Sequence, residues 1–458
     1  MTLIKSISGI RGTIGGKPGD NLTPIDIVKF TAAFASLVKE NNPKKRLKFV
    51  VGRDARISGS LVESLVNSTL VGMGIDVVNT GLSTTPTVEM AVMDLVADGG
   101  IIITASHNPK NWNALKLINN KGEFISAAEG ERVLKLAEEE DITFSNVEEL
   151  GNIENNSTTI ENHINKIIAL KLVDKDLIKK AKFKVAVDAV NSTGGISIPP
   201  LLRALGVEDI IELNCNPSGD FQHDPEPIPE NLHEIRKLVV EEKADIGVVV
   251  DPDVDRLALV MENGELFGEE YTLVAVADYI LQNKKGNTVS NLSSTRALRD
   301  VTEKAGGNYT ASAVGEVNVV EKMKKVGAVI GGEGNGGIIY PELHHGRDAL
   351  VGIALLLTYL AKRKIKLSKL RLEYPNYVIS KNKIELKPGM EVATYFERVI
   401  SHYSNYPIST IDGVKIDFPD GWVHLRTSNT EPIMRVYAES TSVEKAKKYA
   451  TEVIDLIK

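Results

Sequence analysis

The stretch GGIIITASHNPKNWNALK, residues 99–116, contains the most informative change of pattern in the chain. It opens with a short apolar run, 99–103, of the kind found in buried strands. The run leads into Ser-His-Asn-Pro (106–109), where proline cannot continue a central strand and the residue before it is disfavoured in a helix. The chain must therefore turn directly after a core strand, and we expect the turn to present Ser106 as a candidate nucleophile.

The same order of strand, polar turn and helix recurs along the chain. Apolar runs lead into turns rich in glycine, aspartate and asparagine at 183–195, 245–256 and 327–337. Strands that alternate with helices predict parallel sheets, whose functional loops lie at the carboxyl ends of the strands. We therefore expect several of these turns to line one site.

Individual elements can be placed in the N-terminal part. Thr23 is a suitable N-cap, Pro24 fits the first helical turn, and Asp26 lies near the positive end of the helix. The run LKFVV, 47–51, is typical of a buried strand. Between them, apolar residues recur at helical spacing: Ile27, Phe30, Phe34 and Leu37.

Length and composition limit the class of protein. A chain of 458 residues is too long for one hydrophobic core, and its 42% hydrophobic and 25% charged residues are ordinary for a globular protein. It has no apolar run of about 18 residues and no signal-peptide pattern, so we expect a cytoplasmic protein that does not bind membranes. The single Cys215 excludes an intramolecular disulfide.

The charge argues against nucleic acid as a partner. The formal net charge is −7, and lysine and arginine are scattered rather than clustered. An anionic substrate would therefore need a local cluster of cationic residues at its binding site, although the net charge of the protein is negative.

Changes in composition suggest where domains meet. We expect boundaries at the polar NIENNSTT (152–159), after Arg256, and near RLEYPNY (371–377). Beyond the last of these, apolar and polar residues alternate in VKIDF and WVHLRTS, which predicts a smaller α+β domain.

Three aspartates follow a β-branched run in VVVDPDVDRLALV, 248–260. Asp251, Asp253 and Asp255 are two residues apart, so their carboxylates can converge on one hard cation. Acidic residues directly after a buried strand are costly unless they are paired, which argues against a merely solvated turn.

Two other interpretations of these aspartates compete. The spacing imitates an EF-hand, but Arg256 occupies the position that needs glycine, and a strand precedes the loop. The run also resembles the motif of haloacid-dehalogenase-type phosphotransferases, in which Asp251 would carry the phosphoryl group and Asp253 would be the acid. Both this interpretation and a metal site imply phosphoryl chemistry.

Ser106 needs help to act as a nucleophile, because a hydroxyl is weak without a base or a metal. No G-x-S-x-G elbow surrounds it. His107 is its neighbour in sequence, and the side chains of adjacent residues often point in different directions. An acyl-transfer triad is therefore unsupported. Lys116, on the strand-like segment after the turn, could supply a cation or carry a proton.

Two further loops have groups suited to a sugar phosphate. In IGGEGNGGIIYPE (330–342), Glu333 and Asn335 suit vicinal hydroxyls, although a structural turn explains the glycines equally well. The loop in GWVHLRTSNTEPIMRVYAES (421–440) can direct hydrogen-bond donors on short side chains and arginine guanidinium groups at one phosphate. The residues concerned are Arg426, Ser428, Asn429, Thr430 and Arg435.

Together and in this order, these stretches resemble the α-D-phosphohexomutase family of phosphoglucomutases, phosphomannomutases and phosphoglucosamine mutases. TASHNP and DPDVDR carry most of the resemblance, GGEGNGG and RTSNTEP add to it, and GIRG (9–12) and VGRDARISG (51–59) extend it over the whole chain. It implies four domains around a central cleft: three α/β domains with mixed or parallel sheets and a C-terminal α+β domain. The expected limits are 1–151, 152–256, 257–370 and 371–458.

The resemblance also implies a role for each candidate residue and favours the serine over the aspartate nucleophile. Ser106 would be the phosphoserine, and it would bind Mg²⁺ together with Asp251, Asp253 and Asp255. Lys116 and Arg11 would assist proton transfer and charge stabilisation, with His107 as a further catalytic candidate. The implied substrate-binding residues are Arg256 as a nearby cation, Glu333 and Asn335 at sugar hydroxyls, and Arg426, Ser428, Asn429, Thr430 and Arg435 at the phosphate that is not transferred.

The implied reaction is an intramolecular phosphotransfer. Phospho-Ser106 would phosphorylate a hexose monophosphate, and the other phosphate of the resulting hexose 1,6-bisphosphate, which also acts as an activator, would return to the serine. The expected partner is a small-molecule sugar phosphate, bound by a monomer or a homodimer.

One position departs from the pattern of many relatives. Gly337 stands where they place a histidine that is thought to act in proton transfer, and Asn335 replaces the serine before it. Either Lys116 serves alone, or His344 or His345 reaches the site; a surface or structural role is the favoured interpretation of both histidines.

The sugar is less clearly indicated than the reaction. The ending of RTSNTEP and the opening LIKSISGIRGTIGG are closer to phosphoglucosamine mutases, so we expect glucosamine 6-phosphate to be converted to glucosamine 1-phosphate. Phosphomannomutase/phosphoglucomutase activity is the alternative within the family. A sugar phosphate phosphatase and a catalytically silent sugar-phosphate sensor are the alternatives from other classes.

Overall fold

The computed structural model describes residues 2–6, 9–42, 46–139, 141–386, 391–428 and 433–457. The chain divides into two compact units, each described below by itself. Unit 1 comprises Met1–Thr272 and Gly336–Ser368, and unit 2 comprises Leu273–Asn335 and Lys369–Lys458. Three sheets with flanking helices and one antiparallel sheet confirm the expected combination of α/β domains with a C-terminal α+β domain.

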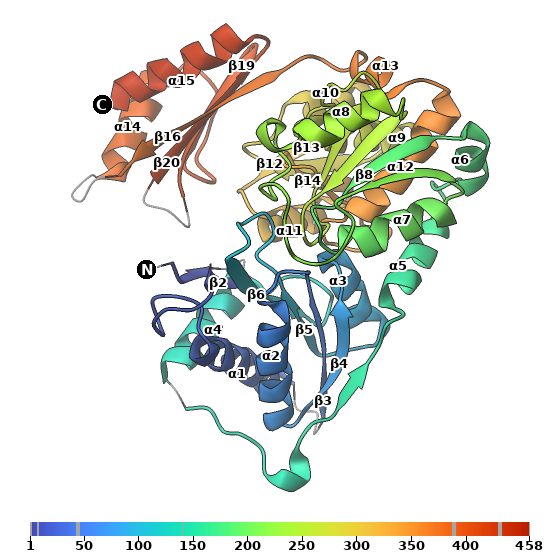
Figure 1. Cartoon of the computed structure of the whole chain (residues 1–458). Coiled ribbons are helices and arrows are strands. Elements are labelled where there is room, and N and C mark those ends of the chain that lie inside the picture. Colours follow the sequence, from blue (N-terminus) through green and yellow to red (C-terminus); the bar gives the residue numbers. More distant parts are fainter. Residues whose placement is uncertain are drawn as a thin grey trace. The chain divides into compact units, whose positions relative to one another are not determined.

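The first sheet of unit 1 has seven strands, in the order β1-β2-β6-β5-β3-β4-β7 (Figure 1). Its central strands β5, β3 and β4 are parallel, and β6 is antiparallel to β5. The strands are β1 Ile4–Ser6, β2 Gly9–Thr13, β3 Leu47–Arg53, β4 Ile75–Leu82, β5 Gly99–Ile103, β6 Trp112–Asn119 and β7 Ile153–Asn155. The helices are α1 Pro24–Asn41, α2 Gly59–Gly72, α3 Thr85–Asp94 and α4 Ala127–Glu139, with the short 3₁₀ helix η1 at Val147–Glu149.

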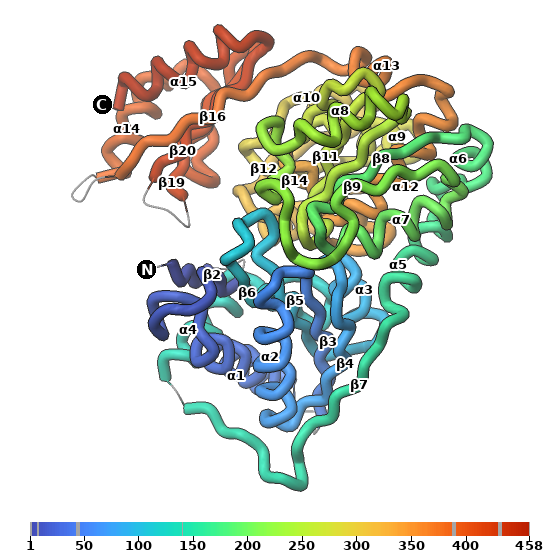
Figure 2. The backbone as a smooth tube through the Cα atoms, in the orientation of Figure 1, coloured from blue at the N-terminus to red at the C-terminus, as the bar shows by residue number. Residues whose placement is uncertain are grey.

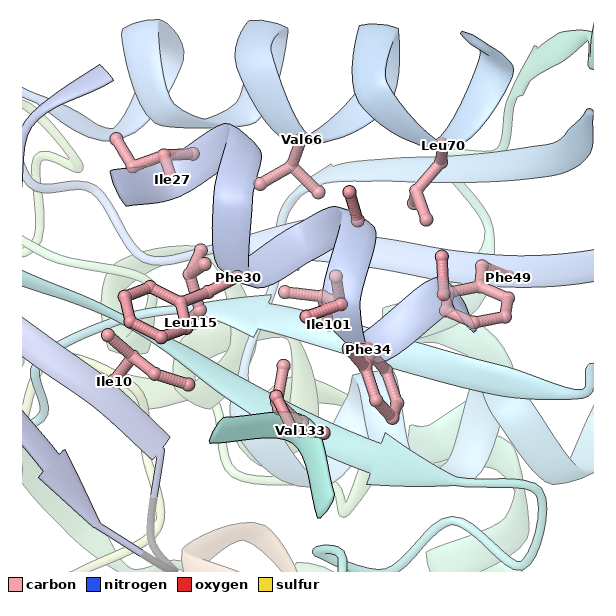
Figure 3. Close-up of a cluster of buried hydrophobic side chains, with 14 of the residues drawn as sticks. Ile10, Ile27, Phe30, Phe34, Phe49, Val66, Leu70, Ile101, Leu115 and Val133 are labelled. Carbon is pink, nitrogen blue, oxygen red and sulfur yellow. The ribbon is translucent and has the colours of Figure 1, made fainter. Parts of the chain in front are cut away.

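Both faces of this sheet are covered by helices. Along β3, Phe49 and Val51 belong to one buried cluster and Val50 to another, as the alternation of side chains along a strand requires. Figure 3 shows side chains of α1, α2 and α4 meeting those of β5 and β6 in the first cluster. The second cluster contains the apolar side of α3, which includes Val88 and Val92.

The start of α1 confirms the predicted cap. The Thr23 side chain accepts the backbone N–H of Asp26, and the Asp26 carboxylate accepts the backbone N–H of Thr23 at 3.1 Å. This reciprocal capping box, with Pro24 in the first turn, satisfies backbone donors that a helix start otherwise leaves without partners.

The second sheet of unit 1 has the order β11-β10-β8-β9, with β10, β8 and β9 parallel and β11 antiparallel. Its strands are β8 Lys184–Asp188, β9 Asp209–Leu213, β10 Ile246–Val250 and β11 Leu257–Met261. Its helices are α5 Thr159–Ile168, α6 Lys175–Ala181, α7 Gly194–Ala204, the 3₁₀ helix η2 Pro229–Asn231 and α8 His233–Glu241. Strand β15 (Gly337–Ile339) and the buried helix α12 (Ala349–Arg363) return to unit 1, and α12 packs against α5, α6 and α7.

Unit 2 contains a parallel group of strands and an antiparallel sheet. Strand β12 lies between β13 and β14, and the antiparallel sheet has the order β16-β20-β19-β18-β17. The strands are β12 Asn287–Asn291, β13 Tyr309–Ser312, β14 Ala328–Glu333, β16 Val378–Glu385, β17 Ile408–Ser409, β18 Val414–Phe418, β19 Gly421–Thr427 and β20 Ile433–Ser440. The helices are α10 Ala297–Lys304, α11 Glu316–Val326, α14 Val392–His402 and α15 Val443–Ile457, while α9 Glu269–Asn283 and α13 Leu367–Arg371 each cross between the units.

Two edge strands lie just past the limits predicted for their domains. Strand β7 pairs with β4 of the first sheet, and β11 pairs with β10 of the second. Figure 2 shows the chain continuing from α4 through a long connection before β7 joins the sheet beside β4. The polar sequence around β7 gave no sign of a strand, because all three of its residues are exposed at the sheet edge. The four sequence-based limits stay predictions.

No helix in the part of the chain that the structure describes is both long and apolar enough to cross a bilayer.

A buried cluster of histidines and carboxylates joins three helices of unit 1. Nε2 of His163, on α5, lies 2.9 Å from Oδ2 of Asp348, and Nε2 of His344 lies 3.3 Å from the same oxygen. Nδ1 of His344 lies 3.4 Å from Glu89 on α3. The other oxygen of Asp348 caps α12 by accepting the backbone N–H of Leu350 at 2.8 Å.

This cluster offers ligand atoms for a metal, but its bonding is that of an ion pair. Both rings face one carboxylate oxygen at hydrogen-bonding distance. Burial lowers the pKa of His344, but its bonds to Asp348 and Glu89 outweigh burial and raise the pKa to about 10. The ring nitrogens of His344 thus face Asp348 and Glu89 within this cluster, and the structural role favoured from the sequence stays a prediction.

We predict that this cluster makes stability depend on pH. The pKa of His344 is raised from 6.5 to about 10, so its contribution is complete below pH 6.5 and is lost as the pH rises towards 10. The free energy of unfolding should fall over this window with a slope of up to about 1.4 kcal/mol per pH unit. Urea unfolding of the wild type and of His344→Gln across the window measures this slope, and equal slopes for the two proteins would show the prediction to be wrong.

Candidate active site

Ser106 lies in the loop after β5, where the sequence predicted a turn. Ser106 is 6% exposed, and its φ of +47° is unusual for a residue other than glycine. Its Oγ donates a hydrogen bond of 2.6 Å to Oδ2 of Asp251, which directly follows β10 in the second sheet. The structure therefore brings together two motifs that are 145 residues apart in the chain.

The loop after β10 curls so that three carboxylates converge. Oδ1 of Asp251 accepts the backbone N–H groups of Asp255 at 3.2 Å and Arg256 at 3.1 Å. Val254 has a φ of +62°, which completes the tight turn. The side chains of Asp251, Asp253 and Asp255 are completely buried, and one carboxylate oxygen from each lies within 4.8 Å of the others.

The aspartate loop fits a divalent cation. Oδ1 of Asp253 and Oδ1 of Asp255 are buried and have no hydrogen-bond partner. Buried carboxylate oxygens without partners are costly, and an oxygen-binding cation would satisfy them. Three carboxylates suit Mg²⁺ or Mn²⁺ better than metals that prefer nitrogen or sulfur ligands. These residues can therefore hold a metal ion.

Protein cations from distant segments oppose this negative charge. Nζ of Lys116, on β6, lies 2.7 Å from Asp253 and 3.4 Å from Asp255. Nη2 of Arg347 lies 2.6 Å from Asp255. Burial raises the pKa of Asp251 well above its usual range, and the neighbouring aspartates add to this effect. Burial also tends to raise the pKa of Asp255, but the positive charges of Arg347 and Lys116 outweigh burial and keep this pKa below its usual range.

The other predicted cations of unit 1 surround His107. Burial lowers the pKa of this imidazole well below its usual value, and the charges of Arg256, Arg11 and Arg347 add to that effect. Nε of Arg256 is buried without a hydrogen-bond partner and lies 4.0 Å from Asp251. Positive charge thus gathers beside Ser106 in a chain of net charge −7, as an anionic substrate requires.

In unit 2, Glu333 is held at the end of β14. Its Oε1 accepts hydrogen bonds from the side chain of Asn291 at 2.9 Å and from the backbone N–H of Gly315 at 3.1 Å. Asn335 lies in the turn that follows, where Gly336 has a φ of +82°. The carboxylate of Glu333 is therefore fixed before any ligand arrives.

Two arginines of unit 2 face each other across neighbouring strands. Arg426 on β19 is directly opposite Arg435 on β20. Burial lowers the pKa of Arg426, the charge of Asp412 opposes this effect, and the charge of Arg435 adds to it. Like charges placed opposite each other destabilise a sheet, so this pair indicates an anion-binding position. The backbone N–H of Ser428 donates to Ile433 at 2.9 Å, and Asn429 and Thr430 lie outside the described residues.

Sequence reasoning missed several residues around the serine and aspartate loops. Thr85 donates from Oγ1 to Asp253 at 2.6 Å, Arg347 pairs with Asp255, and Arg56 contacts the Ser106 loop. The signal for both arginines was an arginine within two residues of an aspartate in a polar turn, Arg56 after Asp54 in GRDARISG and Arg347 before Asp348 in HHGRDAL. Nothing local in the sequence pointed to Thr85.

Comparison with known families covers nearly the whole chain. Residues 3–143, 161–264 and 268–377 match the alpha/beta/alpha domains I, II and III of phosphoglucomutase/phosphomannomutase, and residues 380–456 match its C-terminal domain. A four-domain chain of this kind, with a serine held against an aspartate loop, is a phosphohexomutase, which is an isomerase. The chain belongs to the phosphoglucomutase/phosphomannomutase family.

Individual relatives are named after different sugar substrates. The phosphoglucomutase/phosphomannomutase of Thermococcus kodakarensis is 34% identical over 97% of this chain and 98% of its own. The phosphoglucosamine/phosphogalactosamine mutase of Sulfurisphaera tokodaii is 32% identical over 98% of both chains. A crystal structure of a phosphoglucomutase/phosphomannomutase family protein from Burkholderia thailandensis matches with a TM-score of 0.86 and 25% identity, over 100% of this chain and 97% of that one.

We predict that Asp253→Asn weakens divalent-cation binding at least about tenfold, because it removes one of the converging charges. Titration with Mn²⁺, followed by electron paramagnetic resonance of the free ion, measures the affinity. Asp188→Asn is the control, since Asp188 is equally buried but pairs with His223 outside the cluster. Wild-type affinity in Asp253→Asn would place the cation elsewhere.

Proposed function

We propose that this phosphohexomutase interconverts glucosamine 6-phosphate and glucosamine 1-phosphate through a phosphoserine at residue 106. The observation that carries the mechanism is the 2.6 Å hydrogen bond from Ser106 to a fully buried aspartate that belongs to a cluster of three. The sugar is supported by relatives named as phosphoglucosamine mutases, among them the probable phosphoglucosamine mutase of Methanopyrus kandleri, 32% identical over 98% of this chain.

The proposed reaction has two transfers. In the first, the bond between phosphorus and Ser106 Oγ breaks and Oγ takes up a proton, while a bond forms to the free hydroxyl of the sugar phosphate, whose proton leaves to a base. The product is a hexose 1,6-bisphosphate. In the second transfer, the other phosphate of this intermediate returns to Ser106, and the released sugar oxygen takes up a proton. The net change moves one phosphate between two positions of one sugar.

The residues of unit 1 would carry out the transfer. Asp251, Asp253 and Asp255 would hold Mg²⁺ together with the phosphate on Ser106. When bound, this ion neutralises phosphate charge and orients the group for in-line displacement. Lys116 would offset the charge that develops on the transferring oxygens, and it would hold a proton close to the reacting atoms. Arg11, Arg256 and His107 would complete this positive and proton-exchanging surface.

The residues of unit 2 would recognise the substrate. Glu333, fixed by two hydrogen bonds, and Asn335 would bind sugar hydroxyls. Arg426 and Arg435, with the Ser428–Thr430 loop, would bind the phosphate that is not being transferred. Because the sugar must react from both ends, this phosphate site has to accept a phosphate at either position.

Phosphoglucomutase/phosphomannomutase activity is the second candidate, favoured by the name of the Thermococcus kodakarensis relative at 34% identity. The proposed transfer groups of unit 1 are compatible with both assignments, since they would contact the phosphate and not the substituent at carbon two. No relative or structure reported above is named as a phosphatase, and that alternative is not proposed.

We predict that glucosamine 6-phosphate gives the highest kcat/KM among three esters in coupled assays with Mg²⁺ and a catalytic amount of hexose 1,6-bisphosphate. The others are glucose 1-phosphate and mannose 1-phosphate. Ser106→Ala should abolish isomerisation of all three, because no carrier for the phosphoryl group remains. A higher kcat/KM for glucose or mannose phosphate would contradict the sugar assignment, whereas an active Ser106→Ala would contradict the mechanism.

We also predict that Arg426→Gln lowers activity without lowering stability. It should lower kcat/KM about 100-fold, because a charged hydrogen-bond partner of the substrate is lost. Its melting temperature should change little, because relief of the repulsion with Arg435 offsets the lost attraction to Asp412. Arg398→Gln, an exposed arginine on α14 of the same domain, is the control and should keep wild-type kinetics. If Arg426→Gln loses stability and keeps its activity, Arg426 has a structural role and does not bind substrate.

A further inference from the structure

Arg56 lies between β3 and α2, and its guanidinium is completely buried. Its Nε donates to Oδ2 of Asp54 at 3.0 Å. Its two terminal nitrogens donate only to main-chain carbonyls of one loop, which belong to Ser106, Asn108, Pro109 and Trp112. A guanidinium has five N–H donors, so every donor of Arg56 has an acceptor, and four of them hold the loop that carries Ser106.

A second set of bonds holds the other side of the same serine. Oγ1 of Thr104 accepts the backbone N–H of Ser106 at 2.9 Å and donates to Oδ2 of Asp54 at 2.6 Å. Asp54 therefore connects both sets, because the same oxygen also accepts Nε of Arg56. The peptide before Ser106 is held through Thr104, and the peptide after it is held through Arg56.

This loop needs support for two reasons. Ser106 has a φ of +47°, a conformation that side chains other than glycine rarely adopt and that persists only where the surroundings impose it. Phosphoryl transfer also depends on position, since small displacements of the reacting oxygen lower the rate. Oγ of Ser106 is placed 2.6 Å from Asp251, so the loop conformation determines how the serine faces the aspartates.

We infer that Arg56 is a positioning residue for phosphoryl transfer: its guanidinium fixes the Ser106 loop in the conformation that aims Oγ at the aspartate cluster. The inference rests on the proposed role of Ser106 as phosphoryl carrier and is independent of which sugar is the substrate. Lysine cannot replace Arg56, because an ammonium has three donors without the planar fork that reaches four carbonyls.

The test compares Arg56→Lys with the wild type. One readout is the rate at which Ser106 acquires phosphate from glucose 1,6-bisphosphate, followed by intact-protein mass. Others are kcat and KM for the best sugar phosphate, and hydrogen exchange of the amides in 104–112. We expect phosphorylation and kcat to fall about 100-fold, KM to stay within about threefold, and exchange in the loop to accelerate. Arg53→Lys is the control, since Arg53 lies in the same segment and bonds to Glu63 and the Asp54 carbonyl but not to the loop.

A folded Arg56→Lys with wild-type phosphorylation and exchange would overturn the inference. If that variant does not fold, Thr104→Val tests the same network from the other side, and Thr104→Ser, which keeps the hydroxyl, should restore the rate. Equal rates for the Val and Ser variants would also overturn it. The proposed function is judged on the wild type alone: another preferred sugar changes the substrate and leaves this inference standing, while a wild type that never acquires phosphate on Ser106 removes both.

Discussion

Burial of three carboxylates at the end of one strand is the constraint on which unit 1 depends. Charged groups out of water are costly unless they are paired, and the loop after β10 places three of them side by side. The compensating cations come from other segments, Lys116 from β6 and Arg347 from the turn before α12. Each ion pair therefore also joins elements that are distant in sequence, so the site is a structural junction as well as a place for chemistry.

The sequence predicted what is determined locally. The apolar run before Ser106, the capping box at Thr23 and the aspartate spacing follow from strand, helix and turn preferences, and all are present. Lys116 was also identified as a candidate, because it lies on the strand that follows the serine turn. The family resemblance supplied the four-domain architecture, since length alone indicated only that the chain is too long for one hydrophobic core.

Contacts between distant segments could not be predicted in the same way. Arg56 lies 50 residues from Ser106, and Arg347 lies 92 residues from Asp255, so no periodicity relates them. The first contact depends on sheet order, which places β3 beside β5, and the second depends on the start of α12, where the backbone N–H of Ala349 donates to the Val254 carbonyl in the aspartate loop. His344 shows the same limit in part: Asp348 lies only four residues further along the chain, in the same motif, whereas Glu89 on α3 is far away in sequence and no local pattern connected the two.

Under the proposed function, phosphoryl transfer belongs to unit 1 and sugar recognition to unit 2, a division that would account for relatives of about one-third identity that are named after different sugars. The proposed transfer groups lie in unit 1, where Ser106 is 6% exposed and the aspartates are fully buried, so water has little access to the serine that we propose as phosphoryl carrier. In the proposed function these groups contact only phosphate, which every hexose phosphate shares. The candidate recognition groups lie in unit 2, so substitutions there can change the preferred sugar while the constraint on the buried carboxylates, and hence the transfer chemistry, stays the same.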